Sequence, residues 1–127
     1  SIDGGSNWEL SGLIDVPINS IKINNKDYIF VGSLGRGVYL STDGGGNWIE
    51  KNTYLTDPTV SSLVINSEGD IFVGTYSGGV FISTDNGDEW TQINSGFTNM
   101  EIRSLVIDSS DNIFAGNFFG VYKSWIR

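Results

Sequence analysis

Histidine and cysteine are both absent from this 127-residue chain, and each absence removes a class of chemistry. Without histidine there is no Ser-His-Asp or Cys-His catalytic arrangement and no His-ligated metal. Without cysteine there is no disulfide, thiolate metal site or thiol nucleophile. The expectation for the chain is no catalytic residues, no cofactor and no metal site.

Basic residues are also scarce. The 7 Lys and Arg stand against 15 Asp and Glu, which gives a net charge of −8. Nucleic acids and anionic membranes both require a basic face, so neither is an expected partner. No apolar run approaches the roughly 20 residues of a membrane-spanning helix, so membrane insertion is not expected either. Only 2 Pro accompany 17 Gly, and this balance predicts many tight turns.

The sequence repeats itself with a period of 42 residues. Aromatic, glycine and aliphatic positions recur at that spacing: Phe30, Phe72 and Phe114; Gly32, Gly74 and Gly116; Ile21, Leu63 and Leu105; Ile23, Ile65 and Ile107. Three periods occupy nearly the whole chain, so we expect a single module without a second domain or a linker.

Each repeat predicts four short strands. In the middle repeat, β-branched and aromatic segments at 61–66, 71–74, 80–84 and 89–94 are separated by Gly, Asn, Asp and Ser turns. No segment shows a sustained helical period. Four strands in about 40 residues are typical of a propeller blade, so the predicted fold class is an all-β propeller.

A hairpin motif recurs between the third and fourth strands. Its form is Ser-x-Asp-x-Gly-x-x-Trp, and its members are Ser1, Asp3, Gly5 and Trp8; Ser41, Asp43, Gly45 and Trp48; Ser83, Asp85, Gly87 and Trp90. The Asp can accept hydrogen bonds from turn N–H groups, the Gly can adopt positive φ, and the Trp can cover the hairpin. We interpret the motif as a structural element, because a site repeated identically in every blade is typical of the fold rather than of catalysis.

This motif resembles the Asp-box, also called the bacterial neuraminidase repeat. The runs "DIFVGTYSGGVFISTDNGDEWTQINSG" and "DNIFAGNFFGVYKS" are similar to bacterial secreted Asp-box proteins, including sialidase-like and xyloglucanase-type propellers. The resemblance covers essentially the whole chain. It implies a sialidase-like propeller in an extracellular or periplasmic location. Sialidases of this fold use three Arg, a Tyr nucleophile and an acidic pair, and Arg36, Arg103 and Arg127 do not match that pattern.

The phase of the repeats predicts a split blade. Residues 1–10 are expected to form the outer, fourth strand of a blade, 11–52 and 53–94 two blades, and 95–127 the first three strands of the split blade. Three blades are fewer than the 4 to 8 of ordinary rings. We expect two chains to close a six-bladed ring, each N-terminal strand completing the partner's last blade. A nine-bladed trimer, an open filament and a fragment of a longer propeller remain alternatives.

One end of the blades is predicted to carry variable loops, opposite the hairpin motifs. Its candidate ligand-binding residues are Arg36, Tyr54, Tyr76, Arg103, Phe118 and Phe119. Exposed aromatic residues beside polar groups suit a glycan or a peptide, whereas the alternative interpretation packs them between blades. Asp15 and Asp57 are equivalent, and a carboxylate pair for glycoside hydrolysis is a minor alternative.

The favoured function is a non-enzymatic propeller scaffold or binding module that assembles with copies of itself. The similarity of the repeats also fits a minimal, designed or recently duplicated propeller, and a chain beginning at Ser1 rather than Met fits a processed product or a fragment. The alternative is a carbohydrate-binding or glycoside-hydrolase-type Asp-box protein, or a piece of one. These classes differ in whether asymmetric acidic residues share one pocket.

Overall fold

The computed structural model describes residues 2–97 and 99–124. Over these residues it is all-β, with two four-stranded antiparallel sheets and one of three strands. The first sheet holds β1 (Ile18–Ile23), β2 (Ile29–Ser33), β3 (Val38–Ser41) and β4 (Ile49–Glu50). The second holds β5 (Val60–Ile65), β6 (Ile71–Thr75), β7 (Val80–Ser83) and β8 (Thr91–Gln92). The third holds β9 (Ser104–Ile107), β10 (Ile113–Asn117) and β11 (Gly120–Lys123).

The three sheets share one register. Phe30 lies opposite Leu40 in the first sheet, and Phe72 lies opposite Ile82 in the second. Phe114 lies opposite Lys123 in the third, where the loop before β11 is one residue shorter. The 42-residue period therefore identifies equivalent positions in space, with a spacing of 41 from β7 to β11.

The fourth strands are shorter than the expected segment 89–94, because only Thr91 and Gln92 form β8. Beyond this strand a side-chain oxygen, rather than a backbone carbonyl, accepts the hydrogen bond from the neighbouring third strand. Val80 donates its backbone N–H to Asn94 Oδ1 at 2.8 Å, and Val38 donates to Asn52 Oδ1 at the same distance. An Asn amide thus satisfies the N–H that a longer strand would have paired.

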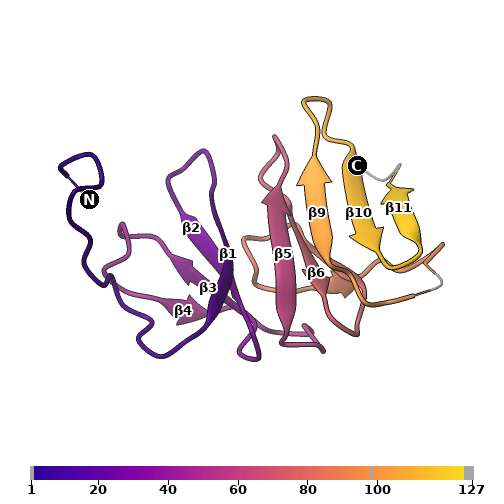
Figure 1. Cartoon of the computed structure of the whole chain (residues 1–127), viewed down its shortest axis with the longest axis horizontal. Coiled ribbons are helices and arrows are strands. Elements are labelled where there is room, and N and C mark those ends of the chain that lie inside the picture. The colour runs from indigo at the N-terminus through magenta and orange to yellow at the C-terminus, as the bar shows by residue number, and fades with distance from the viewer. Residues whose placement is uncertain (1, 98, 125–127) are drawn as a thin grey trace.

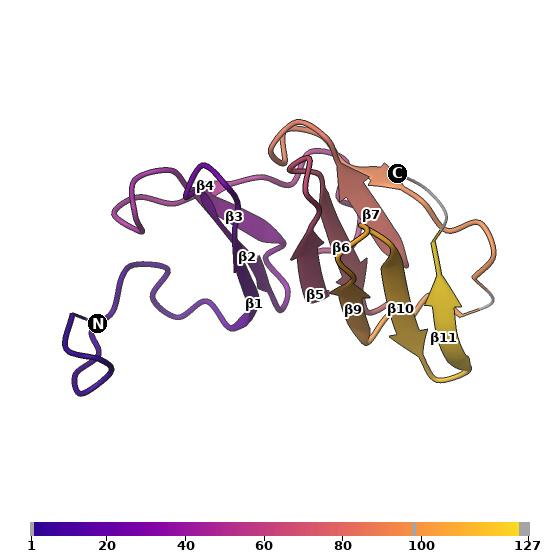
Figure 2. The same cartoon turned by 90° about the horizontal axis from the view of Figure 1, so that it is seen from above.

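The sheets stand side by side like the blades of a fan (Figure 1). Their first strands, β1, β5 and β9, lie next to one another, and each sheet packs its face on the face of the next (Figure 2). Two apolar cores result. The one between the first and second sheets includes Phe30, Leu63 and Phe81, and the one between the second and third includes Phe72, Leu105 and Ile113.

Two glycines of the repeat are required by this close packing. A Cβ on Gly32 would lie 2.5 Å from Val60 Cγ1, and a Cβ on Gly74 would lie 2.5 Å from Ile102 Cγ2. Val60 and Ile102 are equivalent residues at the entry to the following sheet. Each sheet therefore presents a bare backbone to an aliphatic side chain of its neighbour.

The N-terminal segment lies outside the three sheets. Residues 2–17 form no strand among the residues described, and they extend away from β1 at the end of the molecule opposite β11 (Figures 1 and 2). The predicted addition of residues 1–10 to the last blade of a second copy therefore stays a prediction. The segment has no neighbouring strand there, because the third sheet lies at the far end.

Candidate functional site

The two internal hairpin motifs share most of their hydrogen bonds. In residues 41–48, Ser41 Oγ donates to Asp43 Oδ1 at 2.8 Å and accepts from the Gly45 N–H at 2.8 Å. The Asp43 carboxylate also accepts from the backbone N–H and the side-chain amide of Asn47, each at 2.8 Å. The second motif repeats this pattern without the side-chain amide donor, and its residues are Ser83, Asp85, Gly87 and Glu89. The Asp43 and Asp85 carboxylates thus form hydrogen bonds within their own turns.

These donors stabilise the ionised Asp. The side-chain amide and then the backbone N–H of Asn47 lower the pKa of Asp43 to about 2. The backbone N–H of Glu89 and the Ser83 hydroxyl lower the pKa of Asp85 as well. Both shifts result from hydrogen bonds to the charged form. A carboxylate held this way is a poor proton donor at neutral pH.

Each internal hairpin is also fastened to the segment after the preceding hairpin. Trp48 Nε1 donates to the Ser11 carbonyl at 2.8 Å, and Trp90 Nε1 donates to the Lys51 carbonyl at 2.7 Å. Ser11 and Lys51 both lie three residues after a motif Trp. Trp90 is 3% exposed within the first core, and the Lys51 ammonium forms an ion pair with Asp88 at 2.8 Å.

The N-terminal hairpin has the turn but not this attachment. Asp3 accepts from the Asn7 backbone and side chain, as the internal motif Asp residues do from the residue four positions on. Trp8, however, donates to the carbonyl of Gly5 in its own turn, and its side chain is 81% exposed. Ser1, the remaining motif position, lies outside the described residues.

A cavity of about 320 Å³ lies between the second and third sheets, at the position that Trp90 occupies between the first and second. Its apolar lining includes six side chains: Phe72, Val80, Phe97, Leu105, Ile113 and Tyr122. Their equivalents one repeat earlier share a core with Trp90, and they are Phe30, Val38, Leu55, Leu63, Ile71 and Phe81. Sequence reasoning did not predict this cavity, although the expectation of only three strands for residues 95–127 was its signal.

The two outer faces of the fan are apolar and exposed. On the first sheet, Ile18, Ile21 and Ile23 are 43%, 58% and 61% exposed. On the third sheet, Val106 is 57% and Val121 77% exposed. Equivalent residues inside the fan, such as Val60, Leu63, Val64 and Val80, are buried. Large exposed apolar patches of this kind are typical of interaction surfaces.

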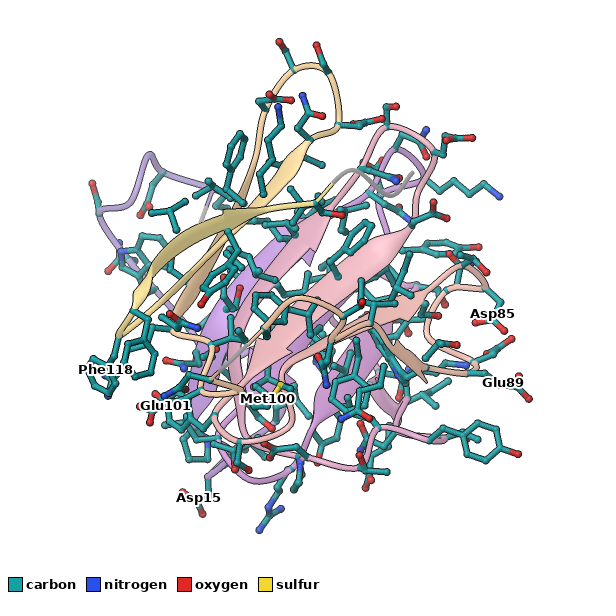
Figure 3. The ribbon with its side chains drawn as sticks, turned by 90° about the vertical axis from the view of Figure 1, so that its right-hand side faces the viewer. Asp15, Asp85, Glu89, Met100, Glu101 and Phe118 are labelled. Carbon is teal, nitrogen blue, oxygen red and sulfur yellow. The ribbon has the colours of Figure 1, made fainter. Side chains whose placement is uncertain are left out.

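The predicted ligand-binding loops lie at one end of the sheets. The loop that contains Arg36 is joined to the following connection through Gly37, whose N–H donates to the Pro58 carbonyl at 2.8 Å. Gly79, in the loop after Tyr76, bonds to Met100 in the same way. Phe118, Met100 and Glu101 lie together on one side of Figure 3, far from Asp85 and Glu89 of a hairpin motif.

Within the predicted ligand set, the structure brings Arg103 and Phe118 into contact. The Arg103 guanidinium lies 4.2 Å from the centroid of the Phe118 ring, and it also forms an ion pair with Glu101 at 2.6 Å. Phe118 and Phe119 are 66% and 71% exposed, so they do not pack between the described sheets of one chain. Tyr54, Tyr76 and Arg36 are exposed too, but no contact joins them to this pair among the residues described.

Asp57 differs in environment from Asp15, its equivalent one repeat earlier. Asp57 is buried and accepts from the Thr59 N–H and from the N–H and hydroxyl of Ser77, at 2.8 to 2.9 Å. Burial alone would raise the pKa of Asp57, but these hydrogen bonds lower it below its ordinary value. Asp15 is exposed in a turn with a φ of 62°. Asp57 thus holds a loop in place.

In the described part of the chain, no group of three or more His, Cys, Asp or Glu residues is arranged to hold a metal ion. The same residues include no helix with the length and apolar character to cross a membrane.

No family model matches the sequence, and no curated protein matches it. Solved structures do resemble the fold. The extracellular domain of BT4673 from B. thetaiotaomicron superposes with a TM-score of 0.72 at 18% identity, covering 93% of this chain and 17% of that one. YCF48 from Cyanidioschyzon merolae gives 0.63 at 18%, covering 92% and 39%. An ancestral GH74 enzyme gives 0.63 at 25%, covering 84% and 17%.

These neighbours are β-propeller proteins of varied function. The chain spans less than half of each of the three structures. The likeness, together with three similar sheets packed face to face, shows that the chain has a propeller-repeat fold.

Proposed function

We propose that this chain is a non-enzymatic propeller scaffold that assembles with copies of itself through its two outer blade faces. The observation that carries the proposal is the match between those faces. Gly32 and Gly74 are each covered by an aliphatic residue of the next sheet, whereas a Cβ on Gly116 would meet nothing within 4 Å. Ile18 is the exposed equivalent of the covering residues Val60 and Ile102.

A polar contact between the first strands of neighbouring sheets also recurs at equivalent positions. Asn19 donates from Nδ2 to the Val60 carbonyl at 3.1 Å, and the Ser61 hydroxyl donates to the Ile102 carbonyl. Arg103 is the next equivalent residue, and the Ile18 carbonyl of a second copy would be its acceptor. Packing of Ile18 on Gly116 would thus continue an interface that the fan already contains twice. A closed six-bladed dimer satisfies both faces of both chains.

The test is the mass of the purified chain by light scattering after size exclusion. We expect twice the chain mass of 13.8 kDa. Gly116→Ala should weaken assembly, because its Cβ would meet the docked Ile18, and Ile18→Asp should abolish it. Ile14→Asp is the matched control, since Ile14 is 65% exposed but lies outside the face. A chain that stays monomeric at high concentration contradicts the proposal, and three chains or very large species replace the dimer with a trimer or a filament.

A second candidate, glycan binding at the loop end, is favoured by the exposed Phe118 and Phe119 beside Arg103. Aromatic faces stack on sugar rings, and a guanidinium can donate to hydroxyls. A glycan array read with the chain and with Phe118→Ala tests this candidate. Binding that survives Phe118→Ala would place the sugar elsewhere, and absence of binding would remove the candidate.

Glycoside hydrolysis is the weaker enzymatic alternative. The GH74 neighbour is an enzyme, but Asp57 here is held by a hydroxyl and two backbone N–H groups. A general acid requires a raised pKa, whereas that of Asp57 is lowered. An extracytoplasmic location belongs to the proposal and is supported by the extracellular domain of BT4673 among the neighbours.

A further inference from the structure

The cavity between the second and third sheets is equivalent to the site that holds the Trp90 side chain in the first core. It is lined by the equivalents of residues that share the first core with Trp90, together with Ile93, Ser95 and Gly96. Ile93 is the equivalent of Lys51, whose carbonyl accepts from Trp90 Nε1 at 2.7 Å. The cavity therefore has the lining expected around a motif Trp, and Ile93 stands at the position of the acceptor residue.

Trp8 is the motif Trp that fits this description. The other two described motif Trp residues, Trp48 and Trp90, donate to the carbonyls of Ser11 and Lys51. Trp8 is 81% exposed, and its hairpin lies at the opposite end of the molecule from β11 (Figures 1 and 2). Its own cavity is out of reach, so a second copy must supply the partner surface.

The strand that follows Trp8 is complementary to β11. In the first sheet Ile49 lies opposite Leu40 and Glu50 opposite Tyr39. At the equivalent positions Glu9 would lie opposite Lys123 and Leu10 opposite Tyr122. The added strand thus brings a carboxylate against an ammonium, where the two internal sheets pair Ile49 with Leu40 and Thr91 with Ile82. Opposite charges in directly facing positions stabilise a strand pair.

Resting on the self-assembly proposed above, we propose that residues 3–10 of one copy add to the edge of β11 in another. The Trp8 indole enters the cavity beside Gly96 and donates to the Ile93 carbonyl, while Glu9 pairs with Lys123. One feature is not reproduced. Gly12 stands where the repeats have Asn52 and Asn94, so the Asn acceptor for a β-strand N–H is absent from the added strand.

The first test separates Trp8 from the apolar faces. Trp8→Ala should weaken association by roughly 100-fold, as removal of a central buried Trp does at interfaces. Its unfolding midpoint, measured on the dilute monomer, should stay that of the parent chain, because Trp8 is exposed there. Trp125→Ala is the matched comparison, because Trp125 is the Trp that belongs to none of the three hairpin motifs. Loss of assembly with Trp125→Ala but not with Trp8→Ala overturns the inference.

The second test is a charge exchange across the new strand pair. Glu9→Lys and Lys123→Glu should each weaken association by about 5-fold, and the double variant should recover most of it, in line with cross-strand pair energies. A double variant no better than either single variant contradicts the pairing.

A disulfide provides a geometric readout. A Cβ on Gly45 lies 3.6 Å from Ser11 Cβ, which is within disulfide spacing, and a Cβ on Gly87 lies 3.1 Å from Lys51 Cβ, slightly less than that spacing. Gly5 and Ile93 are the corresponding pair between copies. Gly5→Cys with Ile93→Cys should link two chains on oxidation, and Lys51→Cys with Gly87→Cys should link within one chain as the positive control. A link within one chain for the Gly5 and Ile93 pair overturns the inference.

These outcomes distinguish the two proposals. If the parent chain is monomeric, the scaffold proposal itself fails. If the parent chain and Trp8→Ala assemble with equal affinity while Gly116→Ala and Ile18→Asp weaken assembly, the outer faces alone carry it and the Trp8 docking is wrong.

Discussion

The two interfaces between neighbouring sheets use equivalent positions of the repeat, yet only the first is completely packed. In the interface between the first and second sheets, Trp90 is 3% exposed and belongs to a continuous core. In the interface between the second and third sheets, the corresponding volume is a cavity of about 320 Å³. The comparison shows that the Trp of the fourth strand completes the packing of a sheet on its neighbour. Among the described residues the third sheet has three strands, and no described Trp fills the cavity beside it.

Removal of the Trp that completes the first interface should have the largest effect. Trp90→Ala should lower the free energy of unfolding by about 3–5 kcal/mol, because a buried aromatic side chain is replaced by a cavity. Urea unfolding followed by circular dichroism measures the change. Trp8→Ala in the dilute chain is the control and should be near neutral. Equal effects of the two variants would contradict the difference in burial.

Adding one carbon at equivalent glycines gives the next largest effect. Gly74→Ala should destabilise the chain by about 1–3 kcal/mol, since its Cβ would lie 2.5 Å from Ile102 Cγ2 and force the two sheets apart. Gly116→Ala should be tolerated in the monomer, where no atom lies within 4 Å of that Cβ. Thermal unfolding of both variants at low concentration measures the contrast. Similar losses at both positions would show that strand geometry, rather than the neighbouring sheet, selects glycine.

A larger side chain in the cavity should make the second interface more like the first. Ala115 lines the cavity at the position of Val73, which is fully buried. Ala115→Val should stabilise the chain by roughly 0.5–1 kcal/mol through partial filling of the cavity. The reverse change, Val73→Ala, should destabilise it by about 1–3 kcal/mol. A destabilising Ala115→Val would mean that the cavity has no room on that side.

Acid titration should give the smallest effect and compares the turns rather than the cores. The pKa of Asp43 is lowered to about 2, so its hydrogen bonds contribute stability above the ordinary value of 3.8 and lose it as the pH falls toward 2. Asp85 titrates in the same direction. Asp43→Asn should therefore flatten the decline in unfolding free energy between pH 4 and pH 2, with Glu68→Gln, at an exposed turn, as the control. An unchanged decline would contradict the role of the Asp43 hydrogen bonds.

The sequence predicted the strands well where the pattern was local. The expected segments 61–66, 71–74 and 80–84 correspond to β5, β6 and β7 within one or two residues at each end. The fourth strand was predicted too long, because the pattern did not show that Asn52 and Asn94 side chains replace part of the ladder. The loop residues Phe118 and Arg103 do meet, but Asp57 was treated as the counterpart of Asp15, and burial with three donors sets it apart.

By itself the sequence determined the period, the all-β class and the internal turns of the hairpin motifs. These depend on contacts within a few residues, such as Asp43 with Asn47, which any chain carrying the motif can form. The tertiary structure decided the rest. The cavity beside Gly96, the bare backbone at Gly116 and the exposure of Trp8 depend on which sheets lie face to face. Packing joins residues about 40 positions apart, and a repeat pattern shows that such partners exist without showing which of them one chain can reach.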